Sequence, residues 1–227
     1  MSNEELKELS KELTFKLLLL QQRISVYDEL MLHKSRALNE KTAKFYVAAM
    51  NQYGNFFVAV ENSLVISLYV ELLSFLGVKL NKNNEIIHDI WGDASLYRLA
   101  EGKNDIKEFL ELITKHKFAL GLIDEIRHHV AHAKRVKETT QLLMPGYHET
   151  VGLLNDASAY LMKVHDEVRG IVGWNKPHLL NEENEAANDT EELLAAISKS
   201  PDSEGIRSEY LSSKQKMREN YNNKGAI

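Results

Sequence analysis

Apolar residues recur three and four positions apart along the first part of the chain, which is the spacing of one buried face of an α-helix. This pattern predicts a long helix that ends near Arg36, and Asn39 is well placed to cap the next helix. A second long pattern covers residues 40–76, with an expected kink near Gly54. Gly77 follows as the residue expected to end it.

Shorter segments follow in the middle of the chain. Residues 80–84 are predicted to form a polar loop, and an apolar cluster around Ile86 to Trp91 comes next. One helix, or two nearly continuous ones, is predicted from Asp105 to Val136, and a last core helix from Glu149 to about Val172. Residues 1–175 are therefore expected to form an all-α, up-and-down bundle of four or five helices.

The composition changes after Trp174, where Asn, Glu, Ser, Lys and Asp dominate. Such a segment buries too little apolar surface to offset the entropy of ordering, so residues 176–227 are predicted to be a polar, partly disordered tail. A short amphipathic helix is expected within it, capped by Asp189 or Thr190, with Leu193, Leu194 and Ile197 on one face. The tail is a candidate contact segment for an antitoxin or another protein partner.

Composition narrows the functional classes. The 227 residues contain no Cys, which excludes disulfides and thiolate sites and fits a reducing cytoplasm. The acidic N-terminus is unlike a secretory signal, and Glu61 and Glu71 interrupt the most apolar stretch, so no membrane span is expected. A net charge of -5 argues against general coating of nucleic acids but leaves room for a local basic cleft.

The segment from Leu122 to Val136 concentrates candidate chemistry, with three histidines and two arginines on a few helical turns. At about 100° per residue, one polar arc collects Asp124, Arg127, His128, His132 and Arg135, whereas His129 falls near the border of the core. The opposite arc is apolar and holds Leu122, Ile123, Ile126, Val130 and Ala133. A rigid helix with one buried face and converging titratable groups on the other can support a reactive site.

The hexapeptide Arg127-His-His-Val-Ala-His132 resembles the Arg-x4-6-His motif of the HEPN superfamily, in which a polar residue commonly follows the Arg. The order of the predicted helices is most similar to that of the abortive-infection-type HEPN proteins. The resemblance implies a metal-independent endoribonuclease without a cofactor, in an antiviral-defence or toxin-antitoxin setting. It also implies a homodimer in which two motifs face each other across one cleft.

The resemblance assigns catalytic roles to Arg127 and His132. Cleavage of RNA by its own 2'-OH needs a base, an acid and a cation beside the developing phosphorane. His132 can carry either proton role, while Arg127 presents a planar fork to phosphate oxygens. His128 and Asp124 are expected to support the site or orient the substrate, and a basic RNA-binding strip is expected at Lys134, Arg135 and Lys137.

One position departs from part of the family. In HEPN toxins that a nucleotidyltransferase antitoxin silences, a Tyr commonly lies two residues after the motif His, but Lys134 occupies that position here. Regulation by modification of such a Tyr is therefore not expected.

Two other interpretations of the segment stay open. His128 and His132 are spaced to hold a zinc ion, with Asp124 as a possible third ligand, although Asp124 is also well placed to pair with Arg127 or His128. The domain can instead be a non-catalytic HEPN-like interaction or nucleotide-binding module. Catalysis requires Arg127 and His132 to face a shared, solvent-open cleft, whereas a binding module tolerates their burial or separation.

Overall fold

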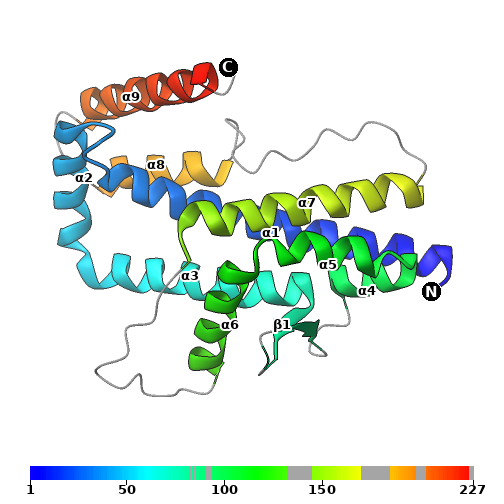
Figure 1. Cartoon of the computed structure of the whole chain (residues 1–227). Helices are drawn as coiled ribbons and strands as arrows, with labels where there is room; N and C mark the ends of the chain where they lie inside the picture. Colours follow the sequence, from blue (N-terminus) through cyan, green and yellow to red (C-terminus); the bar gives the residue numbers. More distant parts are fainter. Residues whose placement is uncertain are drawn as a thin grey trace. The chain divides into compact units, whose positions relative to one another are not determined.

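The computed structural model describes residues 1–81, 83, 85–89, 94–131, 145–169, 185–197 and 203–224. Within these residues the chain is helical apart from connecting turns and one short antiparallel β-hairpin (Figure 1). The expected all-α character is therefore confirmed at this coarse level.

The described elements, in chain order, are α1 (Asn3–Lys34), α2 (Glu40–Gln52), α3 (Gly54–Leu76), β1 (Val78–Leu80), β2 (Ile86–His88), α4 (Leu96–Lys103), α5 (Ile106–Thr114), α6 (Lys117–Ala131), α7 (Tyr147–Arg169), α8 (Glu185–Ile197) and α9 (Ser203–Lys224). The helix expected over residues 40–76 is two helices, separated at Tyr53. The helical pattern that begins at Asp105 likewise divides into α5 and α6.

The chain folds into two compact units, and neither is continuous in sequence. Unit 1 comprises Met1–Gln21 and Val65–Asn181, and unit 2 comprises Gln22–Leu64 and Glu182–Ile227. This division differs from the expected boundary near residue 175. The sequence gives no sign of it because α1 and α3 each contribute to both units without a break in their helical patterns.

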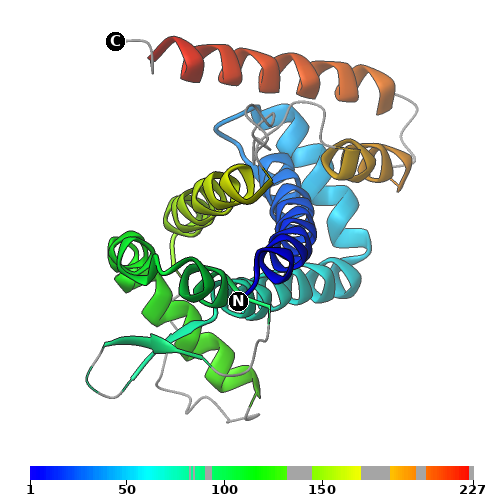
Figure 2. The ribbon, with the colours of Figure 1, turned by 90° about the vertical axis from the view of Figure 1, so that its right-hand side faces the viewer.

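Unit 1 is built around helices α4 to α7, the first part of α1 and the last part of α3. Helix α5 contacts α4 and α7, and α6 contacts α7 and strand β1 (Figures 1 and 2). The core consists of fully buried apolar side chains from these elements, including Leu13, Leu17, Leu72, Phe75, Leu99, Phe109, Ile123 and Leu161. This core fixes α6, which carries the motif.

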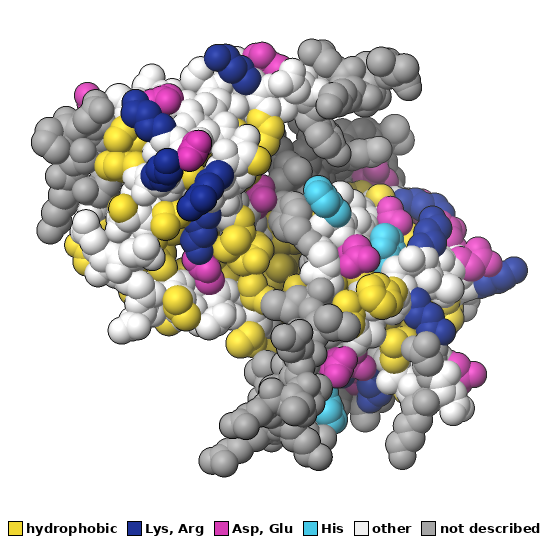
Figure 3. Space-filling model, turned by 60° about the vertical axis from the view of Figure 1, so that its left-hand side comes forward, with side chains coloured by type: hydrophobic (Ala, Val, Ile, Leu, Met, Phe, Trp, Pro, Cys, Tyr) yellow, Lys and Arg dark blue, Asp and Glu magenta, His cyan; other side chains and the backbone are white. Residues whose placement is uncertain are grey.

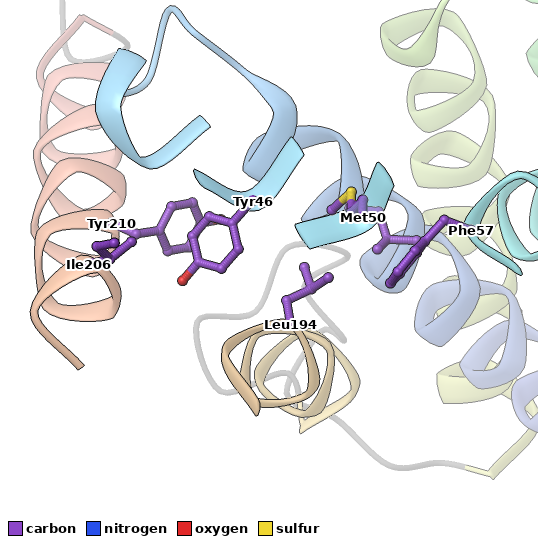
Figure 4. Close-up of a cluster of buried hydrophobic side chains, with 7 residues drawn as sticks. Tyr46, Met50, Phe57, Leu194, Ile206 and Tyr210 are labelled. Atoms are coloured by element: carbon purple, nitrogen blue, oxygen red, sulfur yellow. The ribbon is translucent and has the colours of Figure 1, made fainter. Parts of the chain in front are cut away.

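Unit 2 contains most of the segment that was predicted to be a polar, partly disordered tail. Its hydrophobic cluster joins α1, α2 and α3 to α8 and α9 through Leu30, Tyr46, Met50, Phe57, Leu194, Ile206 and Tyr210 (Figure 4). The expected amphipathic helix corresponds to α8, but Asp189 and Thr190 lie inside it and do not cap it; Leu194 is buried and Leu193 is exposed. Helix α9 packs despite its polar composition because Ile206 and Tyr210, four residues apart, enter the cluster together.

A buried polar group reinforces this packing, and we call it the Glu29 cluster: Glu29, His33, Tyr210 and Lys214. The Glu29 carboxylate accepts hydrogen bonds from the Tyr210 hydroxyl at 2.7 Å and from Lys214 Nζ. The His33 ring stacks on Tyr210 with centroids 4.0 Å apart, and its Nδ1 lies 2.7 Å from the Glu29 carbonyl oxygen. The C-terminal helices are thus tied to α1 through charge as well as through apolar contacts.

Two helix ends follow directly from the sequence. The Asn39 side chain accepts hydrogen bonds from the backbone N–H groups of Lys41 and Thr42, so Asn39 caps α2 as predicted. Gly77 ends α3 with a φ of 70°, in the left-handed region that favours glycine. The Gly77 N–H donates to the Leu73 carbonyl, and the chain turns into β1 at the next residue.

Apolar side chains also reach the surface between charged ones (Figure 3). Among the described residues, Phe15, Phe56, Val58 and Phe118 are large exposed examples. Helix α3 is the one described helix that is long and apolar enough to cross a membrane. Length and composition alone are weak evidence of a span, because the core helix of a soluble protein passes the same test.

Candidate functional site

Helix α6, which carries the motif residue Arg127, is anchored by buried apolar side chains. Leu120 and Ile123 are fully buried and Ile126 nearly so, which supplies the apolar face expected for this helix. Leu122, which was expected in the same stripe, is only partly buried. Helix α6 also contacts strand β1, and both ribbon views show the hairpin beside the helix (Figures 1 and 2).

The guanidinium of Arg127 lies between two carboxylates. Its Nη1 donates to Asp89 Oδ2, and its Nη2 donates to Asp124 Oδ1 at 2.7 Å. The pairing with Asp124, three residues earlier on the helix, agrees with one sequence expectation for this residue. Of the five guanidinium N–H groups, the other three donate to none of the residues that the structure describes. The Arg127 side chain is 24% exposed, so it is not sealed from solvent.

Asp89, directly after β2, is a functional candidate that the sequence reasoning missed. Its side chain is 4% exposed, and Lys79 Nζ on β1 lies 3.4 Å from its second carboxylate oxygen. Burial by itself raises the pKa of this carboxyl, but the hydrogen bond and charge of Arg127, together with Lys79, outweigh burial and hold the pKa below its ordinary value. Asp89 is therefore ionised at neutral pH.

We call Lys79, Asp89, Asp124 and Arg127 the Arg127 cluster. It joins both strands of the hairpin region to α6, because Asp124 Oδ2 also accepts a hydrogen bond of 3.4 Å from the backbone N–H of Leu80. The two cations and two carboxylates cancel in charge. The motif arginine is thus an ordered, charge-compensated group and not an isolated cation.

The close approach of α3, α4 and the hairpin determines where Asp89 lies. The Asp89 backbone N–H donates to the Gly77 carbonyl at 2.8 Å. A Cβ atom at Gly77 would lie 2.2 Å from the Ser95 hydroxyl oxygen, so only glycine fits without displacement. On the other side, the ring of His88 stacks on Tyr97 with centroids 4.3 Å apart. These contacts fix both His88, the last residue of β2, and Asp89, which follows it.

Other predicted site residues divide between described and undescribed segments. His128 is exposed on α6. His132, Lys134, Arg135 and Lys137 lie outside the described residues, as does the side chain of His129. That Arg127 and His132 share one cleft therefore stays a prediction from the sequence. The same holds for the second motif that a dimer would supply.

No group of three potential metal ligands gathers among the residues that the structure describes. Asp124, the proposed third zinc ligand, already accepts hydrogen bonds at both carboxylate oxygens, from Arg127 and Leu80. A zinc ion on His128 and His132 would have to compete with those bonds for this residue.

An open groove also lies along the first part of α1, next to α3 and α4. Acidic and basic side chains line it together, among them Glu5, Glu8, Lys11, Lys16, Arg98 and Glu101. It contains neither Arg127 nor His128, so it is separate from the motif.

Comparison of the chain with models of known protein families, with curated proteins and with solved structures finds no match. The HEPN resemblance therefore depends on the motif and on the order of the helices.

Proposed function

We propose that the chain is a metal-independent endoribonuclease with a HEPN-like bundle, in which Arg127 and His132 are the catalytic residues. The position of Arg127 is the observation that best supports the proposal. Its guanidinium is held by Asp89 and Asp124, a buried apolar face anchors its helix, and 24% of its side chain stays exposed. The proposed setting is cytoplasmic defence against phage or a toxin-antitoxin pair.

The proposed reaction breaks the bond between phosphorus and the 5'-oxygen of RNA. The neighbouring 2'-oxygen attacks phosphorus and gives its proton to a base, while the 5'-oxygen leaves with a proton from an acid. The products are a 2',3'-cyclic phosphate and a 5'-hydroxyl, and neither a metal nor a redox partner is needed. One His132 from each of two protomers would provide the base and the acid.

The role of Arg127 in this reaction is set by the neutral cluster around it. Because Asp89 and Asp124 compensate Arg127 and Lys79, the guanidinium stabilises the phosphorane through aimed N–H groups more than through long-range attraction. Attraction of the RNA backbone is assigned to Lys134, Arg135 and Lys137, whose charges follow the motif in sequence.

A non-catalytic helical interaction or nucleotide-binding module is the second candidate. The observation that favours it is that both Nη groups of Arg127 already donate to carboxylates. Joining the hairpin to α6 would then be the whole role of Arg127.

RNA cleavage in the presence of EDTA tests the proposal. We expect cleavage by the wild type, its loss in Arg127→Ala and His132→Ala, and a 2',3'-cyclic phosphate end. Arg98→Ala on α4 and exposed His148→Ala on α7 are matched controls that should cut as the wild type does. Equal cleavage by both motif variants would refute the ribonuclease proposal, and loss of wild-type activity with EDTA would favour the zinc site.

The Arg127→Ala variant has a structural cost. Arg127→Ala leaves the buried Asp89 carboxylate without its main partner, which costs about 3–5 kcal/mol for buried pairs. Circular dichroism must therefore show that this variant is folded before its inactivity is interpreted. His132 lies outside the described residues, so the fold of His132→Ala is checked in the same way.

The proposed homodimer has a separate test. Sedimentation equilibrium at the concentrations of the cleavage assay should show a dimer. A chain that is monomeric and fully active over that range would contradict a site built from two facing motifs.

A further inference from the structure

Asp89 is the most deeply buried charged member of the Arg127 cluster. Its side chain is 4% exposed, compared with 18% for Asp124 and 24% for Arg127. It comes from a segment 38 residues away from Arg127 in sequence, whereas Asp124 is on the same helical turn. Asp89 is thus the tertiary contact that sets the direction of the guanidinium, and Asp124 is the local one.

An incoming phosphate cannot easily take the place of Asp89. Displacing the carboxylate would leave a buried negative charge whose remaining cationic partner is Lys79 at 3.4 Å, and burying a poorly paired charge is strongly unfavourable. A phosphate would instead meet the N–H groups that Asp89 and Asp124 do not use. Asp89 therefore stays in place while Arg127 binds its ligand.

The backbone around Asp89 is fixed on both sides. Its N–H donates to the Gly77 carbonyl, and the preceding residue, His88, pairs with Val78 in the hairpin and stacks on Tyr97. The position of the carboxylate is therefore supported by the hairpin and by α4 as well as by α6. A reaction that depends on Arg127 would depend on this second element too.

We infer that Asp89 is a positioning residue for Arg127, so that the β1–β2 hairpin forms part of the reactive site. This inference rests on the proposed function. Asp89 does not touch the substrate; it holds the guanidinium at a fixed angle so that the unused N–H groups point at a phosphate. Asp89 thus determines whether the bound guanidinium is aimed correctly at the transition state.

The split between kcat and KM is the first test. Asp89→Asn should lower kcat for RNA cleavage by about 100-fold, because a misdirected guanidinium no longer meets the transition state. KM should stay the same or fall, because a negative charge beside the phosphate ligand is removed. Asp89→Glu, which restores the carboxylate, should recover most of kcat.

Asp156→Asn is the control, since it makes the same change at another hydrogen-bonded carboxylate of unit 1, which lies 2.9 Å from His116 Nε2. It should leave both constants unchanged. If Asp89→Asn cuts RNA with wild-type kcat, or if Asp89→Glu does not recover activity above Asp89→Asn, the inference is overturned.

A nuclear magnetic resonance measurement tests the same inference without cleavage. In the full-length wild type, Arg127 should give two separate Nη signals, because its two carboxylates hinder rotation of the guanidinium. In Asp89→Asn these signals should merge. Titration with inorganic phosphate should shift the Arg127 Nε–H signal in the wild type while the two Nη signals stay separate.

The combined outcomes separate the inference from the proposed function. A phosphate-responsive, ordered Arg127 in a protein that cuts no RNA would overturn the ribonuclease and support the positioning role. Cleavage that Asp89→Asn leaves intact would do the reverse. Separate Nη signals that persist in Asp89→Asn, or an Arg127 Nε–H signal that phosphate does not shift in the wild type, would overturn the positioning role.

Discussion

Two buried carboxylates, Asp89 in unit 1 and Glu29 in unit 2, each pair with a cation from a distant part of the chain. In the Arg127 cluster the cation is 24% exposed. In the Glu29 cluster the Lys214 side chain is only 9% exposed, and the remaining partners, Tyr210 and His33, are buried aromatic residues. The two pairings thus differ in solvent access: part of the Arg127 side chain is open to solvent, whereas Lys214 is enclosed and has a structural role.

Removing the enclosed cation should have the largest effect on stability. Lys214→Met leaves the Glu29 carboxylate buried with Tyr210 as its main donor, which should lower the free energy of unfolding by about 3–5 kcal/mol. Urea unfolding measures the change. Exposed Lys216→Met, on the same helix, is the matched control and should change stability by less than about 0.5 kcal/mol. Equal effects of the two variants would show that the pairing of Glu29 contributes nothing.

The contributions of the two clusters to stability should depend differently on pH. Burial lowers the pKa of His33 to about 4, with the Glu29 carbonyl and carboxylate opposing and Lys214 adding to the shift. His33 therefore binds a proton near pH 6.5 in the unfolded chain but only near pH 4 in the folded chain. Stability from this source is present above pH 6.5 and falls by about 3 kcal/mol as the pH drops to 4.

The Arg127 cluster should not respond over the same range, because the pKa of Asp89 lies below its ordinary value and Asp89 stays ionised. Its contribution is lost only in stronger acid, as the pH falls through that lowered pKa. Urea unfolding at stepped pH tests this, with His33→Gln as the comparison. Burial raises the pKa of Glu191, which opposes the loss of stability in acid. Glu191 is present in both the wild type and His33→Gln, so the difference between their pH profiles isolates the contribution of His33. If the free energy of unfolding depends on pH in the same way in His33→Gln and in the wild type, His33 is not the source of the acid sensitivity.

A smaller effect is expected from the turn that carries the hairpin. Gly77→Ala places a methyl group against Ser95 at a positive φ, which should cost about 1–3 kcal/mol. Amide hydrogen exchange should speed up in β1 and β2 but not in α9. Gly54→Ala is the matched control, since no atom lies within 4 Å of the added Cβ, and it should not destabilise. Uniform acceleration in both units would contradict a local effect on the hairpin.

Local signals in the sequence were sufficient for much of the secondary structure. Asn39 and Gly77 mark helix ends through their own side-chain or backbone chemistry, so no distant contact is needed to place them. The strands were not predicted, because three-residue strands are too short to show an alternating pattern.

The tertiary pairings were largely invisible in the sequence. Asp124 could be matched with Arg127 because both lie on one helical turn, but Asp89 and Arg127 are 38 residues apart and Glu29 and Lys214 are 185 apart. One signal could have identified Asp89: a lone carboxylate within the apolar cluster Ile86–Trp91 needs a partner if it is buried. The packing of α8 and α9 was missed for the same reason as these pairings, because it depends on partners near the other end of the chain.

The balance of charge around Arg127 has a consequence for the ionic-strength dependence of RNA binding. A cation that already has carboxylate partners displaces few condensed counterions from the RNA backbone, and the slope of log affinity against log salt counts those counterions. Replacing Arg127 should therefore leave this slope nearly unchanged, whereas each uncompensated lysine or arginine that meets a phosphate adds close to one to it.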